Sequence, residues 1–167
     1  HMRKMCMDFS KEHNKSKFRM LDSLMHSNLQ FNIPKLFSFL VQDFIDLQTN
    51  AFEKKLHLLQ SDKVAVRSSA ADEDESVSSL AGEYDSILNI PLRKPEKIIE
   101  AINIVISSYE KKRPLLPDDE IIIQEMVEST TMSGVIFTHD LNTGAPYYVI
   151  NYDDQSGLTD TVTSGGG

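Results

Sequence analysis

The chain has 167 residues, of which 40% are hydrophobic, and its formal net charge is −8 at pH 7. This length and apolar content suit a globular domain with a buried core, and the acidic charge disfavours nucleic acid as a partner, because phosphate backbones are held mainly by Lys and Arg. A single cysteine, Cys6, and the absence of any apolar run of membrane length predict a cytoplasmic protein with neither an internal disulfide nor a membrane span.

The two ends of the chain suggest a piece of a larger protein. His1 and Met2 look like the remnant of a cleaved tag, so residues 1–16 are expected to form an N-terminal arm outside the domain. The domain itself is expected to span residues 17–167, and its last residues, TVTSGGG, end without a closing helix or strand.

Two helices are expected in the first third of the domain. Apolar residues at helical spacing predict a short helix over residues 17–28, followed by a turn around Pro34. Between Leu36 and Gln60, apolar residues recur with a period of about 3.6 residues, which predicts one long amphipathic helix.

Strands dominate the remainder of the chain. Residues 63–67 and 86–90 read as strands, and Pro95 near the start of the run 94–112 marks another helix. Three more β-rich runs follow, the last two joined by residues typical of a hairpin turn: 120–127, 133–140 and 145–152. Helices followed by antiparallel strands predict an α+β fold.

The loop after residues 63–67 carries the strongest chemical signal. Arg67 ends the strand, Ser68 follows it, and Ser86 returns a hydroxyl at the start of the next strand. A guanidinium fork with hydroxyl donors suits a phosphate or carboxylate, and Gly82 allows backbone amides to approach an oxyanion closely. Four carboxylates at residues 72–75 oppose a polyphosphate. The alternative is therefore a surface loop with an ion pair to Arg67.

A second candidate site lies at the end of the run 120–127, at Gln124, Met126 and Val127. Backbone groups at a strand end can pair with adenine while Met126 packs on its ring, and the alternative is a core strand with a polar end. Neither metal-ligand spacing nor a Ser/His/Asp set involves the histidines His13, His26, His57 and His139. No metal site is therefore predicted within the chain.

The segment Val66–Ser86, VRSSAADEDESVSSLAGEYDS, resembles a motif of the phosphoenolpyruvate synthase and pyruvate phosphate dikinase family. Residues 121–144 and, more loosely, residues 16–44 are similar to two other segments of that family in the same order. The resemblance implies the N-terminal part of an ATP-grasp nucleotide-binding domain.

The resemblance also implies roles for single residues. Arg67 matches the arginine that grips and orients the ATP phosphates, which makes it the candidate catalytic residue. Lys17, with Lys15 as an alternative, matches the N-terminal phosphate-binding lysine. The remaining candidates match the loop that covers the phosphates or the linker between two lobes that holds adenine: Ser68, Gly82, Ser86, Gln124, Met126 and Val127.

The whole protein implied by this family binds ATP with Mg²⁺ and passes a phosphoryl group, through a phosphohistidine domain, to pyruvate or another small acceptor. No part of this chain matches the phosphohistidine domain or the magnesium ligands, so those ligands are expected outside it and the chain alone is expected to be inactive. Lys15-Ser16-Lys17 replaces a Gly-Gly-Lys run, and no family match extends beyond about Ile150. These departures leave open a degenerate ATP-grasp module that serves as a binding or scaffold domain without catalysis.

Overall fold

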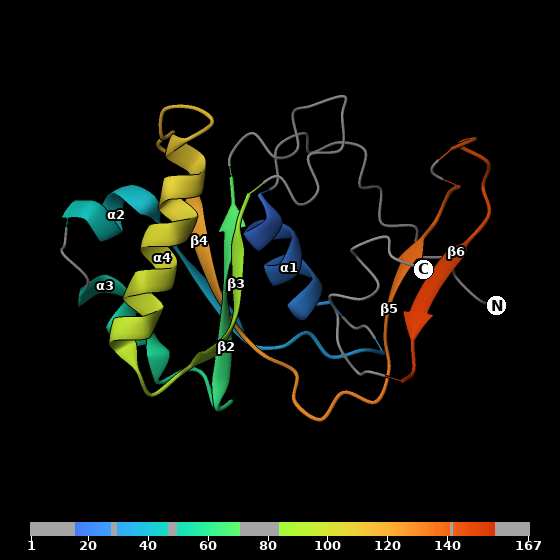
Figure 1. Cartoon of the computed structure of the whole chain (residues 1–167), viewed down its shortest axis with the longest axis horizontal. Helices are drawn as coiled ribbons and strands as arrows, with labels where there is room; N and C mark the ends of the chain where they lie inside the picture. The colour runs from blue at the N-terminus through green and yellow to red at the C-terminus, as the bar shows by residue number, and fades with distance from the viewer. Residues whose placement is uncertain (1–15, 28–29, 47–49, 71–83, 141, 156–167) are drawn as a thin grey trace. The chain divides into compact units, whose positions relative to one another are not determined.

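The computed structural model describes residues 16–27, 30–46, 50–70, 84–140 and 142–155. The chain divides into two compact units, His1–Met126 and Val127–Gly167. The described elements of the first unit are α1 (Lys17–Met25), β1 (Leu36–Leu40), α2 (Val41–Asp46), α3 (Asn50–Leu56), β2 (Lys63–Ser69), β3 (Ser86–Pro91), α4 (Pro95–Glu110) and β4 (Glu120–Glu125), shown in Figure 1.

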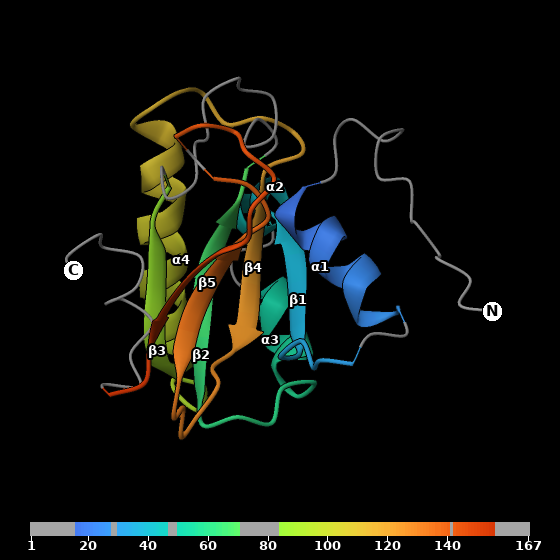
Figure 2. The ribbon, with the colours of Figure 1, turned by 90° about the vertical axis from the view of Figure 1, so that its right-hand side faces the viewer.

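The four strands of the first unit form one antiparallel sheet in the order β1-β4-β2-β3, which can be followed in Figure 2. Strand β4 is paired on both sides, and its residue Ile123 lies opposite Phe37 of β1 and Val66 of β2. Because side chains alternate between the two faces of a strand, this row belongs to one face of the sheet. All three side chains are buried in the hydrophobic core.

Helices α2, α3 and α4 cover this apolar face, whereas α1 lies on the other side of the sheet (Figure 1). The apolar stripe of α4 includes the fully buried Ile98 and Ile102. Phe39 of β1, Phe44 of α2 and Phe52 of α3 pack against one another, with ring centroids 5.9 to 6.0 Å apart. Aromatic packing of this kind joins one strand and two short helices into a single core.

The prediction of one helix from Leu36 to Gln60 is wrong, because this segment forms β1, α2 and α3. Residues Leu36–Leu40 pair with Glu120–Gln124, and the buried Phe37 and Phe39 alternate along the strand. A strand ladder and burial against the sheet outweigh an apparent helical period, since short apolar runs fit both patterns. The other predicted elements of this unit are confirmed, although α1 is shorter than expected.

The second unit contains an antiparallel pair, β5 (Ser133–Phe137) and β6 (Val149–Asp153), so the predicted hairpin is confirmed. In its turn, the Asp140 carboxylate accepts hydrogen bonds from the Thr143 hydroxyl at 2.8 Å and the Thr143 amide at 2.7 Å. Both bonds lower the pKa of Asp140, and the bond from the hydroxyl has the larger effect. Helices together with antiparallel sheets make the chain an α+β protein, as predicted.

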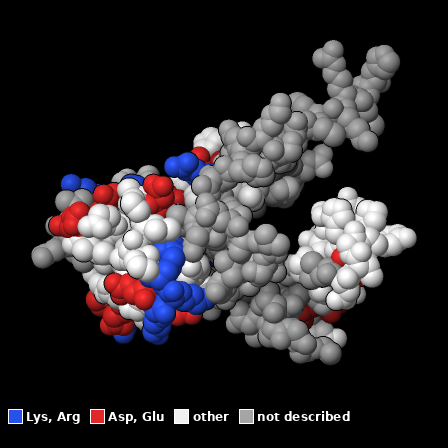
Figure 3. All heavy atoms as spheres, turned by 90° about the horizontal axis from the view of Figure 1, so that it is seen from above, with Lys and Arg blue, Asp and Glu red and all other residues white. Residues whose placement is uncertain are grey.

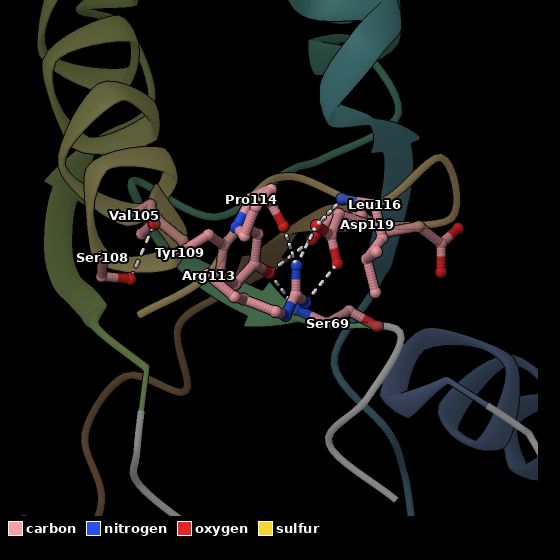
Figure 4. A network of polar contacts seen from close by, with 9 residues as sticks. Ser69, Val105, Ser108, Tyr109, Arg113, Pro114, Leu116 and Asp119 are labelled. Atoms are coloured by element: carbon pink, nitrogen blue, oxygen red, sulfur yellow. Dashed lines mark hydrogen bonds and ion pairs between the residues drawn. The ribbon is translucent and has the colours of Figure 1, made fainter. Parts of the chain in front are cut away.

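A buried ion pair closes the connection between α4 and β4 (Figure 4). The fully buried Asp119 accepts hydrogen bonds from Arg113 Nη1 at 2.8 Å and Nη2 at 2.7 Å, and from the Leu116 amide at 2.8 Å. Its backbone carbonyl accepts a hydrogen bond from the Val41 amide at 2.9 Å. The pair therefore fixes the start of β4 relative to both α4 and α2.

Tyr109 of α4 links the adjacent ends of β2 and β4 (Figure 4). Its hydroxyl donates to the Glu120 carbonyl and accepts from the Ser69 amide, each at 2.8 Å. Its ring packs edge-to-face on Tyr84, with centroids 4.9 Å apart, next to the first residues of β3. One helix side chain thus holds three strand ends together.

Helix α1 is docked by hydrogen bonds at its N-terminus. The Ser16 hydroxyl accepts from the Arg19 amide at 3.4 Å and donates to the Glu120 carboxylate at 2.7 Å. The Phe18 amide donates to the Ser69 hydroxyl at 3.1 Å. The helix therefore begins beside the ends of β2 and β4.

We expect Arg113→Met to lower the free energy of unfolding by about 3 kcal/mol, because it keeps the apolar stem but leaves the buried Asp119 carboxylate without its cation. Urea denaturation would measure the loss. Lys97→Met, which removes the exposed pair between Lys97 and Glu100, is the control and should change stability far less. Equal losses in the two variants would contradict a structural role for the buried pair.

We expect Ser16→Ala to weaken the first turn of α1 by about 1 kcal/mol, the usual contribution of an N-cap hydroxyl. Hydrogen exchange measured by NMR should then be about fivefold faster at the Arg19 and Met20 amides, with α4 unchanged. Unchanged exchange in α1 would show that the cap and the Glu120 contact do not hold this helix.

Candidate functional site

The polar face of the sheet, opposite the core, carries several polar side chains beside apolar residues such as the fully buried Ile122. In register, Arg67 of β2 lies between Ile122 of β4 and Ser86 of β3, and Gln124 lies opposite Ala65. Because paired residues share a face, the side chains of Arg67, Ser86 and Gln124 belong to the same side of the sheet. Three residues predicted from separate parts of the sequence are thus brought together.

Arg67 and Gln124 are in direct contact. Nη1 of Arg67 donates a hydrogen bond to Oε1 of Gln124 at 3.0 Å, and the arginine is only partly buried. Since the amide is neutral, it orients the guanidinium without cancelling its charge. The cation therefore stays suited to a phosphate or carboxylate. The alternative ion pair with residues 72–75 lies outside the described residues.

Lys17, in the first turn of α1, reaches the same strand. Its Nζ donates a hydrogen bond to the backbone carbonyl of Ser68 at 3.3 Å, next to Arg67 in sequence. This bond places the ammonium beside β2. The site thus joins an ammonium from α1 and a guanidinium from β2.

Ser68 contributes differently from the prediction of a hydroxyl directed at phosphates. It pairs in register with Ile121, a core residue, and is 1% exposed. Alternation therefore directs its side chain to the core face, away from Arg67. Its carbonyl, which positions Lys17, is the group that serves this site.

Sequence reasoning missed Glu120. Its carboxylate accepts hydrogen bonds from Ser16 at 2.7 Å and from Ser38 at 2.9 Å, and so joins α1, β1 and β4. These partners are 104 and 82 residues away in sequence, so no local pattern could have indicated them. The start of an apolar strand was the sole signal at this position.

The predicted adenine-holding residues lie at the boundary between the two units along the chain. The first unit ends at Met126 and the second begins at Val127. The Met126 amide donates to the Lys63 carbonyl at 3.0 Å, whereas the Val127 side chain is 63% exposed. An adenine bound here would therefore meet groups other than the Met126 amide. Gly82 and Lys15 lie outside the described residues.

Charge on this unit is mixed. On the face seen in Figure 3, Lys and Arg lie among Asp and Glu instead of forming one basic patch. Within the described ranges, no three His, Cys, Asp or Glu side chains gather where they could hold a metal ion. Glu120 and Asp119 accept hydrogen bonds from neighbouring side chains. No helix in the described part of the chain has the length and apolar character needed to cross a membrane.

Comparison with known proteins identifies relatives of this chain. It is 32% identical over 141 residues to the uncharacterized phosphotransferase YvkC of Bacillus subtilis. The matched region covers 72% of this chain and 15% of that protein. It is 32% identical over 113 residues to a probable phosphoenolpyruvate synthase of Methanothermobacter thermautotrophicus, covering 61% of this chain and 16% of that protein.

A third relative is the prodigiosin synthesizing transferase PigC of Serratia marcescens, 31% identical over 110 residues, or 61% of this chain and 12% of that protein. The matched region thus spans less than a fifth of each of these three relatives. Residues 15–165 match the family described as the pyruvate phosphate dikinase AMP/ATP-binding domain. This chain belongs to that family.

Proposed function

We propose that the polar face of the four-stranded sheet binds ATP as part of the ATP-grasp domain of a phosphoenolpyruvate-synthase-like phosphotransferase. The observation that carries the proposal is the contact between Arg67 and Gln124, with Lys17 held on the neighbouring carbonyl. Membership of an AMP/ATP-binding family supports a nucleotide as the ligand.

The length of β4 suits a nucleotide lying along it. Ser69 lies opposite Glu120 near the start of α1, and Ala65 lies opposite Gln124, two residues before the end of the first unit. Four residues separate these rows, or about 13 Å at roughly 3.3 Å per residue. We place the adenine at the Gln124 end and the phosphates toward Lys17.

In this arrangement each polar group has a separate task. Arg67 and Lys17 neutralise and orient the phosphates, and Ser86 faces them from β3. Gln124, Met126 and Val127 hold the adenine, and Gly82 belongs to the loop that covers the phosphates. Binding that aligns the transferred group and compensates its charge is the main contribution a protein makes to phosphoryl transfer.

The activity of the whole protein is a further part of the proposal. Two relatives are named as a phosphotransferase and a probable phosphoenolpyruvate synthase. We infer transfer of a phosphoryl group from ATP to a phosphohistidine domain and then to pyruvate or another small acceptor. Magnesium would supply additional charge neutralisation when bound, from ligands outside this chain.

We expect ATP with Mg²⁺ to bind the 167-residue chain saturably, and Arg67→Ala to weaken binding by about tenfold or more, since hydrogen bonds to charged groups contribute about 1.5–3 kcal/mol. Isothermal calorimetry or ligand-observed NMR would measure the affinity. Lys97→Ala is the matched control, because it removes one positive charge from α4 on the other side of the sheet.

Equal weakening in both variants would mean that overall charge, and not this site, attracts the nucleotide. No binding to a folded wild-type chain would contradict the proposal for this chain. ATP binding without any phosphoryl transfer in a longer protein would favour the alternative, a module that binds or scaffolds without catalysis.

A further inference from the structure

The residues on either side of Lys17 are both attached to the sheet. The Ser16 hydroxyl donates a hydrogen bond to the Glu120 carboxylate at 2.7 Å, and the Phe18 amide donates to the Ser69 hydroxyl at 3.1 Å. Glu120 and Ser69 lie directly opposite each other in the pairing of β4 with β2. The backbone of Lys17 is therefore held between two attachments to a single row of the sheet.

The Glu120 side chain is itself held at both of its oxygens. Oε2 accepts the hydrogen bond from Ser16, and Oε1 accepts one from the Ser38 hydroxyl of β1 at 2.9 Å. The Tyr109 hydroxyl of α4 binds the backbone of the same row: it donates to the Glu120 carbonyl and accepts from the Ser69 amide, each at 2.8 Å. Because β1 and α4 both fix this row, Glu120 is a rigid point of attachment for α1.

The position of the Lys17 ammonium depends on where α1 begins. Its hydrogen bond to the Ser68 carbonyl is 3.3 Å long, beyond the usual N–H···O distance of about 3.0 Å, so this bond by itself is a weak restraint. A lysine side chain also has a flexible four-carbon stem. The region that the ammonium can reach is therefore set by where the backbone of Lys17 is held.

We propose that Glu120 is a positioning residue for the phosphate end of the site. Through Ser16, its carboxylate fixes the start of α1 and so keeps the Lys17 ammonium beside β2. This inference rests on the proposed nucleotide site and adds a residue that acts through another side chain. Binding is tighter when the groups that meet a ligand are already in place, because less of the interaction energy is lost in ordering them.

The charge of Glu120 distinguishes positioning from a purely electrostatic effect. A carboxylate near a polyphosphate repels it, so removal of Glu120 would strengthen ATP binding if the side chain had no other role. A positioning role has the opposite consequence. We expect Glu120→Ala to bind ATP with Mg²⁺ about fivefold more weakly than wild type, because Ser16 loses its acceptor. Glu100→Ala is the matched control: it removes an exposed carboxylate from α4, on the other side of the sheet, and should keep wild-type affinity.

Glu120→Gln tests whether hydrogen bonding, and not charge, carries this effect. Its amide oxygen can accept from one serine hydroxyl and its –NH₂ group can donate to the other, since a hydroxyl is both donor and acceptor. The affinity for ATP should therefore return to the wild-type value or exceed it. Isothermal calorimetry on the 167-residue chain would measure all of these affinities. Binding of ATP by Glu120→Ala at wild-type strength or tighter, or equal weakening in Glu120→Gln and Glu120→Ala, would overturn the inference.

A double-mutant cycle with Lys17→Met shows whether Glu120 acts through the ammonium. Lys17→Met keeps an apolar stem but removes the charge, and should itself weaken ATP binding about tenfold. In that background, Glu120→Ala should cause little further loss. If Glu120 merely stabilised the fold, its removal would weaken binding by the same factor in both backgrounds, and this additivity would overturn the inference. Wild-type ATP affinity in Lys17→Met would overturn it as well.

Failure of this inference is distinguishable from failure of the proposed function. If the wild-type chain binds ATP and Arg67→Ala weakens that binding, while Glu120→Ala does not, the nucleotide site stands and only the role of Glu120 is wrong. If the folded wild-type chain binds no ATP, the proposed function fails, and the positioning role fails with it.

Discussion

The register of β4 is the constraint on which both the core and the candidate site depend. With β1 and β2 paired on its two sides, its odd-numbered residues Ile121 and Ile123 enter the core, and Glu120 and Gln124 face the polar side. A shift by one residue would exchange these faces, burying a carboxylate and an amide in the core. Correct pairing of this strand therefore decides on which face of the sheet its polar side chains lie.

Several interactions fix this register at both ends of the strand. At the start, Asp119 is held by Arg113, and the Glu120 carbonyl by Tyr109. At the end, the amides of Glu125 and Met126 donate to carbonyls of residues that flank β1 and begin β2. These bonds are local to the strand ends and do not involve the side chains of Arg67 and Gln124. The polar groups that fix the register are thus different from the two side chains, Arg67 and Gln124, that form the candidate site.

Much of this architecture follows from local patterns. Strands β2, β3 and β4 and helix α4 are bounded by proline or polar turns and have strong periodicity, so the sequence was sufficient for them. Phe37 and Phe39 misled the prediction, because five residues of a strand followed by two short helices imitate one helical period. Their partners in β4 lie more than 80 residues further along the chain. Periodicity alone does not reveal a pairing between such distant segments.

The site was partly predictable for a similar reason. Arg67 and Gln124 were indicated by local chemistry and by a family resemblance, and Lys17 by the resemblance alone. The contact between Arg67 and Gln124, by contrast, requires the register of two strands. The same register turns the Ser68 hydroxyl to the core, which no count of serines could indicate. Glu120 has polar partners from three elements and is recognisable only after folding. The sequence was thus sufficient to identify most of these residues, but it did not indicate the direction in which their side chains point.

The most direct test of this account is a titration of the isotope-labelled chain with ATP, followed residue by residue by NMR. Signals from the polar face should shift together, including the Arg67 guanidinium, the Gln124 side-chain amide and the Val127 backbone amide, while those of α4 remain in place. Shifts confined to α4, or to the β5–β6 hairpin, would contradict a nucleotide site on the polar face of the sheet.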